Sequence, residues 1–468
     1  MDQTHNQTLE QIDRRTVFHP NTDLAAFADG RAESTIVTGA EGIRIRDGKG
    51  REWIDAFASL WCVNIGYGRR EIAETLHRQT LEMAYYHSHA GHSSEPVIQL
   101  TDRVLRMCPP GMSRIFWGLQ GSDAHETQVK IIRYYNNVLG RPAKKKLIAR
   151  QRAYHGLTCM SASLLGVPKF HAGFDLPLPG VLHVSAPYYF HRADEAMDER
   201  AFSAMLADEL DGTIRREGAD TVAAFFAEPV VGVGGVIPSP AGYWEAILPV
   251  LAQHDVLLVA DEVVTGFGRM GTDFGAGFYG LKPDMMTISK GLTSGYFPLA
   301  GSVVNERVWS VLAEGSARYG PFAHGFTYAA HPLGAAVAMT NLDIIAREGL
   351  TENAARMGAR LRQGLTDALG DHPMVGDIRG EGLLACVEFV ADRARRTLFD
   401  PALGIGPRLA RACRDEGLIV RPLPDGDMLG YAPPLTLTAE DVDQIVGRTA
   451  RAVARETDAI RAEGLWPR

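Results

Sequence analysis

Six short apolar runs, separated by longer amphipathic stretches, occupy the middle of the chain. They cover residues 115–117, 146–149, 222–227, 256–260, 285–289 and 299–304. Apolar runs of this length that alternate with helical patterns are typical of a mostly parallel sheet with helices on both faces. The pattern therefore predicts an α/β fold. In open sheets of this kind, ligands bind at the carboxyl ends of the strands.

The two ends of the chain show a different pattern. Residues 42–46 and 52–54 are expected to form a hairpin, and shorter strands are expected at 382–390 and 418–421. Thr438 is a suitable N-cap for a long amphipathic helix that follows it. No linker-like or repetitive segment divides the 468 residues. We therefore expect two joined domains: a large domain over residues 61–333, and a smaller α+β domain built from residues 1–60 and 334–468.

Charge and cysteine usage exclude several classes of function. The chain has 48 Lys and Arg against 56 Asp and Glu, a net charge of −8, with the two signs mixed, so no nucleic-acid-binding stripe is expected. The one basic run, Lys144 to Lys146, is expected to be an exposed loop. No apolar run approaches the roughly 18 residues of a membrane span, and the polar start lacks the core of a signal peptide. Five scattered cysteines indicate a reducing compartment, so we expect a cytoplasmic protein.

Charged residues follow two of the predicted strands. Asp261 and Glu262 come directly after the run 256–260, and Lys290 follows the run 285–289. Alone, a strand-end acid is usually a cap for the next turn, and a strand-end lysine is usually solvated. Together they fit pyridoxal 5'-phosphate, because a lysine amine can form a Schiff base and a carboxylate can keep the pyridine nitrogen protonated. The lysine, once released by the amino substrate, can then carry a proton as a general acid and base.

A third motif, Gly121-Ser122-Asp123-Ala-His-Glu126, follows another predicted strand and opens a helix. The free N–H groups and the dipole of a helix N-terminus favour a phosphate group. Alone the motif is weak evidence, since Ser or Asp before a helix is more often a plain cap. Beside the lysine and the two acids, it supplies the expected phosphate end of the site.

These motifs resemble those of the class III aminotransferases of the fold type I pyridoxal enzymes, in particular the pyruvate-linked ω-transaminases. The resemblance covers nearly the whole chain, with ordered matches at 61–68, 153–156, 226–229, 261–263, 289–291, 324–327 and Arg421. It implies transfer of an amino group from an amine or ω-amino acid to a keto acid, with pyruvate the expected acceptor, in a ping-pong cycle through Lys290.

The resemblance also implies which residues bind the cofactor. Gly121 and Ser122 would bind its phosphate, Tyr154 would stack on one ring face and Val263 would pack on the other. His155 belongs to the same motif as Tyr154 and is expected to contact the cofactor, and Glu228 would lie near Asp261. Thr327 would reach the phosphate of a neighbouring subunit, which implies a homodimer with shared active sites, or a tetramer built from such dimers.

Substrate contacts are implied for Trp61, Tyr154, Arg421 and His89. Arg421 would bind the α-carboxylate of pyruvate or alanine and move away when a carboxylate-free amine binds, a use suited to a planar guanidinium. Without the resemblance, the two aromatic residues would be interpreted as core residues and Arg421 as a surface arginine. His89 and Asn21 replace aromatic residues of the amine-accepting relatives, so a roomier and more polar pocket is expected.

Three alternatives remain open at this stage. The segment Gly266-Phe-Gly268-Arg-Met-Gly271 matches the glycine pattern of an NAD(P)-dependent oxidoreductase, although no helix clearly begins at its end. The run His87-Ser-His89-Ala-Gly-His92 has alternating histidines, but no acidic or cysteine ligand lies near it, so no metal site is expected. A pyridoxal aminomutase or decarboxylase of the same fold is the third alternative, and Trp61 and Arg421 favour simple transamination over it.

Overall fold

A seven-stranded sheet forms the centre of the molecule in this computed structural model, which describes residues 8–466. Its strand order is β4-β12-β11-β10-β7-β5-β6. The strands are β4 (Met112–Gly118), β5 (Lys146–Arg150), β6 (Val181–Val184), β7 (Val222–Ala227), β10 (Leu257–Asp261), β11 (Met285–Ile288) and β12 (Ala300–Asn305). Only β12 runs antiparallel to its neighbours. All six predicted strands and the mostly parallel sheet are confirmed, whereas β6 was not predicted.

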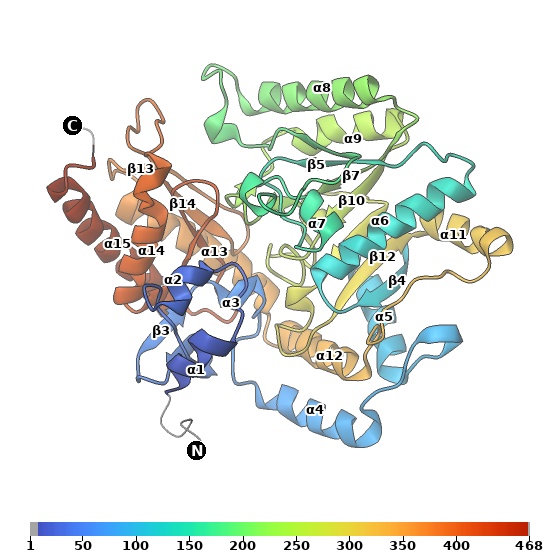
Figure 1. The fold of residues 1–468 in the computed structure, drawn as a ribbon, viewed down its shortest axis with the longest axis horizontal. Helices are drawn as coiled ribbons and strands as arrows, with labels where there is room; N and C mark the ends of the chain where they lie inside the picture. The colour runs from blue at the N-terminus through green and yellow to red at the C-terminus, as the bar shows by residue number, and fades with distance from the viewer. Residues whose placement is uncertain (1–7, 467–468) are drawn as a thin grey trace.

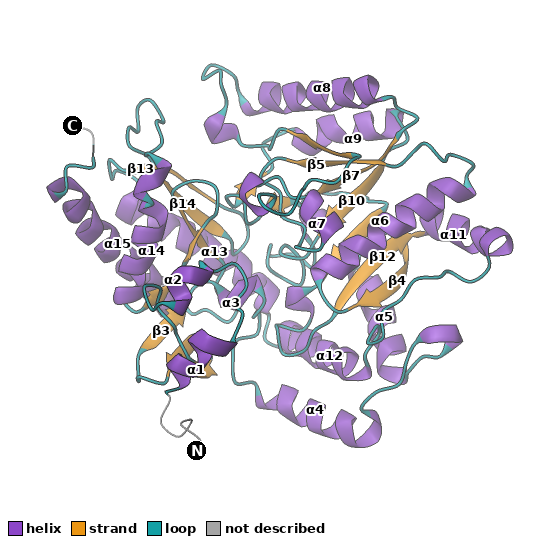
Figure 2. Cartoon of the chain, in the orientation of Figure 1, coloured by secondary structure: helices purple, strands orange, loops and turns teal. Residues whose placement is uncertain are grey.

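Helices cover both faces of this sheet (Figure 2). They include α6 (Gly121–Val138) and α11 (Glu306–Tyr319) on one face, and α8 (Glu199–Glu217) and α9 (Tyr243–Gln253) on the other. Successive residues of β7 point to opposite faces, so Phe225 packs with α8 and α9 while Phe226 packs with α6. A strand buried on both faces must be apolar throughout, which explains the uninterrupted runs of the sequence.

The two ends of the chain lie together, as the blue and red ribbons of Figure 1 show. The first small sheet contains β1 (Val37–Glu41), β2 (Arg44–Asp47), β3 (Glu52–Asp55) and β15 (Leu418–Ile419). The second contains β13 (Val375–Arg379), β14 (Ala385–Phe389), β16 (Arg421–Pro422) and β17 (Met428–Tyr431). The predicted hairpin is confirmed as β2 and β3, and β15 pairs in parallel with β3 although more than 360 residues separate them. The domain boundaries given above remain a prediction.

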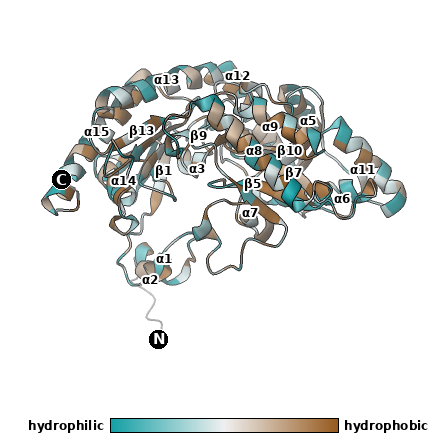
Figure 3. Cartoon of the chain, turned by 90° about the horizontal axis from the view of Figure 1, so that it is seen from above, coloured by the Kyte–Doolittle hydropathy of each residue, from teal (hydrophilic) through white to brown (hydrophobic). Residues whose placement is uncertain are grey.

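Helices complete the molecule around these sheets. The longer ones are α4 (Arg70–Met83), α5 (Glu95–Met107), α12 (Pro332–Arg347), α13 (Leu350–Leu369), α14 (Ile405–Asp415) and α15 (Ala439–Ala462). The shorter ones are α1 (Leu9–Thr16), α2 (Leu24–Ala28), α3 (Ala58–Trp61), α7 (Cys159–Ser163) and α10 (Gly275–Phe278). Peripheral helices such as α11 mix hydrophilic and hydrophobic residues (Figure 3), as expected for helices with one face in water. None of the described helices is long and apolar enough to cross a membrane.

The basic run differs from its predicted exposed position. Lys144 is buried, and its Nζ donates hydrogen bonds to the carbonyl oxygens of Ala219 (2.9 Å) and His254 (3.0 Å). Lys146 already belongs to β5. The prediction of an exposed position was therefore wrong for Lys144, because a lysine can be buried when backbone carbonyls at the ends of neighbouring elements accept hydrogen bonds from its ammonium group.

Candidate active site

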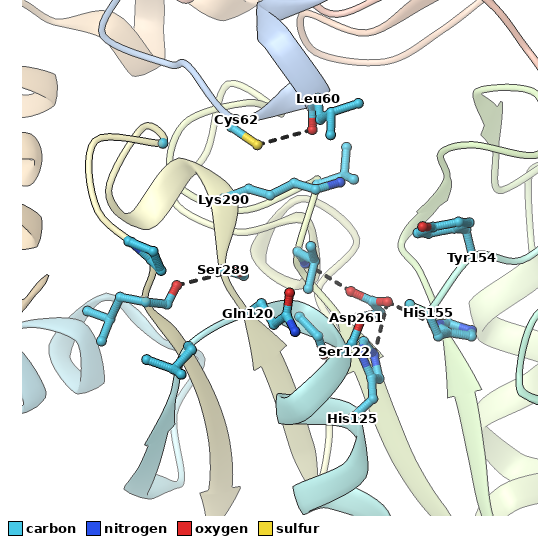
Figure 4. Close-up of a pocket in the computed structure, with 18 of the residues that line it drawn as sticks. Leu60, Cys62, Gln120, Ser122, His125, Tyr154, His155, Asp261, Ser289 and Lys290 are labelled. Carbon is cyan, nitrogen blue, oxygen red and sulfur yellow. Dashed lines mark hydrogen bonds and ion pairs between the residues drawn. The ribbon is translucent and has the colours of Figure 1, made fainter. Parts of the chain in front are cut away.

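A cavity of about 360 Å³ lies beyond the carboxyl ends of β10 and β11. Among the residues that line it are Gly121, Ser122, Tyr154, Asp261 and Lys290, and Figure 4 shows most of them facing one another. The strand ends and the start of α6 therefore bring the three sequence motifs together, as predicted.

Lys290 enters the cavity directly after β11. Its backbone has a φ of +47°, a left-handed conformation that is costly for a residue with a side chain. Burial lowers the pKa of Lys290, and its Nζ lies 5.9 Å from the centre of the Trp61 ring. A buried amine with a lowered pKa is more often unprotonated and therefore more nucleophilic.

Asp261 ends β10 and receives contacts on both carboxylate oxygens. Oδ1 accepts the N–H of Val263 (3.0 Å), and Oδ2 accepts Nδ1–H of His155 (2.7 Å). Nε2 of His125 lies 3.1 Å from the same Oδ2. Burial favours the neutral acid, but the charge and close contact of His125 and the hydrogen bond of His155 outweigh it and hold the pKa of Asp261 below its usual range. The carboxylate is thus kept ionised inside the protein.

Glu228 lies close to Asp261 but behaves differently. Its Oε1 accepts the N–H of Tyr154 (3.1 Å), and its Oε2 accepts the N–H of Gly232 (2.7 Å). Burial, followed by the charge of Asp261, raises the pKa of Glu228 to about 7. Two buried carboxyl groups with separated pKa values are typical of a functional site.

The start of α6 forms a narrow cradle. Gly156 has a φ of +120°, and a Cβ on it would lie 2.4 Å from Oγ of Ser122. A Cβ on Gly121 would lie 3.2 Å from the side chain of Val263. Asp123 accepts the N–H groups of the two residues before the helix, which fixes the turn. The arrangement leaves free N–H groups at the start of the helix beside the cavity.

The segment at α3 is strained. Ala58, Ser59 and Trp61 have φ values of +47°, +61° and +60°. Asp55 holds the segment, since its carboxylate accepts the N–H groups of Phe57 (3.0 Å) and Ser59 (2.7 Å). Conformations of this kind cost about 1–3 kcal/mol per residue and often occur at functional sites.

The predicted substrate residues occupy different positions. Trp61 is buried behind the cavity lining, and the guanidinium of Arg421 lies 5.1 Å from the ring of Phe57 and acts electrostatically on Tyr154. Neither Trp61 nor Arg421 is in the first layer of lining residues.

Thr327, His89 and Asn21 do not line this cavity. Tyr85 donates a hydrogen bond from its hydroxyl to the carbonyl of Thr327, and Nε2 of His89 lies 3.4 Å from the carbonyl of Phe326, so these two segments lie side by side. Asn21 is an exposed turn residue. The proposed roles of Thr327 and His89 would have to be exercised across a subunit boundary.

His125 and Cys62 are among the lining residues that were not predicted. His125 was part of the quoted motif, and it precedes Val129 by four residues and Ile132 by seven, which places it on the buried face of α6. That spacing was the signal that could have identified it. Nothing in the sequence distinguishes Cys62, which follows the strained turn.

The glycine-rich segment 266–271 has a packing role. A Cβ on Gly268 would lie 2.9 Å from Thr351, and one on Gly271 would lie 2.8 Å from Ala355, both in α13. Arg269 is buried and donates to Asn64 (2.8 Å). No helix begins at the end of this segment, so the glycines permit close contact with α13 and do not form a dinucleotide-binding turn.

The family model for "Aminotransferase class-III" matches residues 27–453. The chain belongs to the class III aminotransferases. This aminotransferase is 55% identical to the diaminobutyrate–2-oxoglutarate transaminase of Halomonas elongata over 98% of each chain. It is 40% identical to gamma aminobutyrate transaminase 3 of Solanum lycopersicum, over 92% of this chain and 83% of the relative.

The fold agrees with the family. The crystal structure of the omega transaminase from Pseudomonas jessenii in complex with PMP superposes with a TM-score of 0.95 at 40% identity, covering 97% of this chain and 99% of that one. The predicted fold type I architecture and the predicted family are confirmed. The oxidoreductase alternative is wrong, since the family model matches residues 27–453 and the relative from Halomonas elongata covers 98% of the chain.

Class III aminotransferases use pyridoxal 5'-phosphate, and the residues around the cavity fit this cofactor. The cradle at Gly121 and Gly156 leaves room for a phosphate group beside free helix N–H groups. Lys290 offers a half-buried amine with a lowered pKa, and Asp261 offers an ionised carboxylate. The predicted cofactor is confirmed.

Proposed function

We propose that the enzyme transfers an amino group from an amine or ω-amino acid to a 2-oxo acid, with pyruvate as the acceptor. The observation that carries the proposal is the position of Arg421, a half-buried guanidinium beside Tyr154. Burial lowers the pKa of Arg421, and no carboxylate of the described residues pairs with it. A half-buried cation without a carboxylate partner among the described residues is suited to the carboxylate of a substrate.

The chain's own residues have separate tasks in this proposal. Lys290 binds the cofactor covalently and, when released, moves a proton at the α-carbon of the substrate. Asp261 holds a proton on the ring nitrogen, and Gly121 and Ser122 hold the phosphate. When bound, the cofactor supplies the electron-withdrawing ring that makes this proton removable. Tyr154 and Val263 enclose the ring from its two faces, and His155 orients Asp261.

The number of guanidinium groups near the cavity favours pyruvate as the acceptor. The described lining residues include no arginine, and Arg421 acts electrostatically on Tyr154, which lines the cavity. One guanidinium matches one carboxylate, whereas 2-oxoglutarate carries a second. The name of the relative from Halomonas elongata supports 2-oxoglutarate instead, with diaminobutyrate as donor. The names of the tomato relatives point to ω-amino acids such as 4-aminobutyrate.

A substrate panel separates these possibilities. Purified enzyme would be supplied with 2,4-diaminobutyrate, 4-aminobutyrate or a carboxylate-free amine, each with pyruvate, 2-oxoglutarate or glyoxylate. We expect the highest kcat/KM with pyruvate among the acceptors. A clear preference for 2-oxoglutarate would overturn the pyruvate assignment and require a second cation, which a partner subunit would have to supply.

Replacement of Arg421 tests its role directly. Arg421→Ala is expected to lower kcat/KM for pyruvate and alanine by at least roughly 30-fold, since losing such a contact costs about 2–5 kcal/mol. Single-turnover reaction with a carboxylate-free amine should keep most of its rate, because that amine makes no contact with the guanidinium.

Arg421→Lys serves as the matched variant, since it keeps the charge but loses the bidentate fork, and an intermediate loss is expected. Equal losses in both half-reactions would show that Arg421 maintains the fold or the cofactor and does not select the substrate.

We further propose a homodimer with shared active sites, because Thr327 and His89 lie on exposed segments outside the cavity of their own chain. Sedimentation analysis would measure the assembly, and a fully active monomer would contradict the proposal. A cytoplasmic location remains a prediction, supported by five free cysteines.

A further inference from the structure

Two histidines from different elements contact one carboxylate oxygen. His125 comes from the first turns of α6, and His155 comes from the loop after β5. Nε2 of His125 lies 3.1 Å and Nδ1 of His155 lies 2.7 Å from Oδ2 of Asp261. The side chains of the three residues are at most 3% exposed, and Figure 4 shows both imidazoles directed at the carboxylate.

The hydrogen bond of Nδ1, the second ring nitrogen of His125, shows where this imidazole carries a proton. Nδ1 lies 2.8 Å from the carbonyl oxygen of Gly121, and a carbonyl can only accept a hydrogen bond, so Nδ1 carries a proton. Oδ1 and Oδ2 of Asp261 each accept an N–H group, from Val263 and His155, which favours the ionised carboxylate. Beside an ionised Oδ2, the lone pair of an unprotonated Nε2 would be repelled, so the geometry favours a proton on both nitrogens of His125. The contact at Nε2 departs from straight hydrogen-bond geometry, so its attraction is mainly that of opposite charges.

The surroundings of His155 favour a neutral imidazole. Its Nδ1 donates to Asp261, and its Nε2 is buried without a hydrogen-bond partner among the described residues. A second proton on Nε2 would be a buried donor without an acceptor, which is costly. Burial lowers the pKa of His155 to about 4, and the charge of Asp261 does not reverse this effect.

The surroundings agree with one cation at this position. Glu228 and Asp123, the other carboxyl groups that act on His125, both attract an imidazolium. Arg150 acts on His155 and on Glu228. Burial alone would lower the pKa of His125, but the charge of Asp261 outweighs burial and raises it.

We propose that His125 is a positioning residue that carries a permanent positive charge and thereby keeps Asp261 ionised for the cofactor ring, while His155 stays neutral and only orients the carboxylate. The inference rests on the assignment of Asp261 to the ring nitrogen proposed above. Without an imidazolium, Asp261 would be a buried carboxylate close to a second carboxyl group, Glu228. Under these conditions one of two acids takes up a proton, and a protonated Asp261 could no longer stabilise a protonated ring.

Nitrogen NMR of full-length enzyme with ¹⁵N-labelled histidine measures the two charge states, both with and without cofactor. The variants His125→Gln and His155→Gln each remove one histidine signal and thereby assign the two signals. If His125→Gln does not fold, His125→Asn is used in its place. We expect the doubly protonated signature for His125 and the neutral Nδ1–H signature for His155 at pH 7.5. A neutral His125 would overturn the proposal. This measurement without cofactor does not depend on where the cofactor ring lies.

The visible absorbance band of the holoenzyme provides the second readout. His125→Gln keeps a polar group of similar reach but removes a unit charge, so the pH midpoint of the band should rise. A rise of about one pH unit is expected for a charge roughly 10 Å away at an effective dielectric constant of about 20. His155→Gln exchanges one neutral group for another and should shift the midpoint much less.

Equal shifts in the two variants would mean that His125 acts only as a hydrogen-bonding group, which would overturn the inference. If NMR showed a doubly protonated His125 but neither variant shifted the absorbance midpoint, the positive charge of His125 would be supported. The assignment of Asp261 to the cofactor ring would then be rejected.

Discussion

Lys290 and Asp261 stand at the ends of adjacent strands and share one buried cavity, but burial affects them in opposite ways. It lowers the pKa of the lysine, which helps an amine that must act as a nucleophile. The same burial disfavours the ionised carboxylate, and the two histidines are needed to offset it. The lysine therefore needs little support from its neighbours, whereas the aspartate needs a dedicated set of them.

Replacement of the lysine gives the first test at this scale. Lys290→Ala should abolish borohydride-reducible attachment of the cofactor and lower turnover by at least about 10²–10⁴-fold, because both the attachment and the proton transfer are lost. Mass spectrometry of the reduced protein and steady-state rates measure the two effects. Lys282→Ala, at the exposed start of the same strand region, is the matched control. A reducible adduct remaining in the Lys290 variant would show that another lysine binds the cofactor.

Glu262 gives a pH-dependent test. Burial raises the pKa of Glu262 to about 7, although hydrogen bonds from Thr265, Ala276 and Gly275 lower it. A folded-state pKa above the unfolded value means that the folded protein binds the proton more tightly. This stabilisation is complete below about pH 4.3 and is lost as the pH rises to about 7, by about 1.4 kcal/mol per pH unit.

Glu262→Gln removes this dependence. The unfolding free energy of the wild type relative to the variant should therefore fall between pH 5 and 7, measured at a fixed cofactor concentration. The exposed Glu245→Gln controls for the loss of a surface carboxylate. If the difference in unfolding free energy between wild type and Glu262→Gln stayed constant from pH 5 to 7, the raised pKa of Glu262 would be contradicted.

Lys290 and Asp261 were predictable from the sequence because an acid and a lysine at the ends of two predicted strands together match the needs of one cofactor, although each alone is ordinary. His125 was not, since a polar residue in the first turns of a helix is ordinary, and its partner Asp261 is 136 positions away. The burial of Lys144 was missed for a similar reason, because the carbonyls that accept its protons come from distant loops.

At the scale of elements, the strands that are buried on both faces were predicted most accurately from the sequence. β7 and β10 were predicted almost to the residue because every position in them is buried. β6 is only four residues long, contains His183 and has half-buried positions, so its periodicity is too weak to recognise. Among the short strands near the C-terminus, β14, β15 and β16 were located only approximately, and β13 and β17 were not predicted.

The start of α15 provides a test of an element. Thr438 accepts the N–H of Asp441 (3.2 Å), and Asp441 accepts the N–H of Thr438 (3.0 Å) in return. Thr438→Ala should lower the free energy of unfolding by about 1 kcal/mol, because a helix N–H loses its acceptor. Thr438→Ser keeps the hydroxyl and should retain most of the stability. If the two variants lost equal amounts in urea unfolding, the methyl group of Thr438 would be responsible.

At the scale of the whole molecule, a buried polar cluster joins the second small sheet to the large part of the chain. Arg379 of β13 donates to the carbonyl of Gly235 (2.7 Å) and to Glu388 of β14 (2.5 Å). Glu388 also accepts hydrogen bonds from Tyr188 and His191. Burial opposes the charge of Glu388, but His191 and Arg379 outweigh it and lower its pKa to about 2.

Breaking this cluster should affect stability strongly. Arg379→Ala leaves Glu388 buried without its cation, which should cost about 3–5 kcal/mol of unfolding free energy. The double variant Arg379→Ala with Glu388→Ala should lose much less than the sum of the two single losses, because the unpaired charge is gone. Urea unfolding of the four proteins measures the cycle, and additive losses would contradict a coupled pair.

The parallel pairing of β15 with β3 has a consequence for synthesis on the ribosome. β3 is made among the first 60 residues, but its partner edge is not supplied until Leu418 and Ile419 have left the exit tunnel. For most of translation, the nascent polypeptide therefore displays an unpaired strand edge of the kind that recruits other chains. A transcript truncated before codon 418 would yield a protein in which this edge of β3 stays unpaired. Such fragments should depend on chaperones to remain soluble.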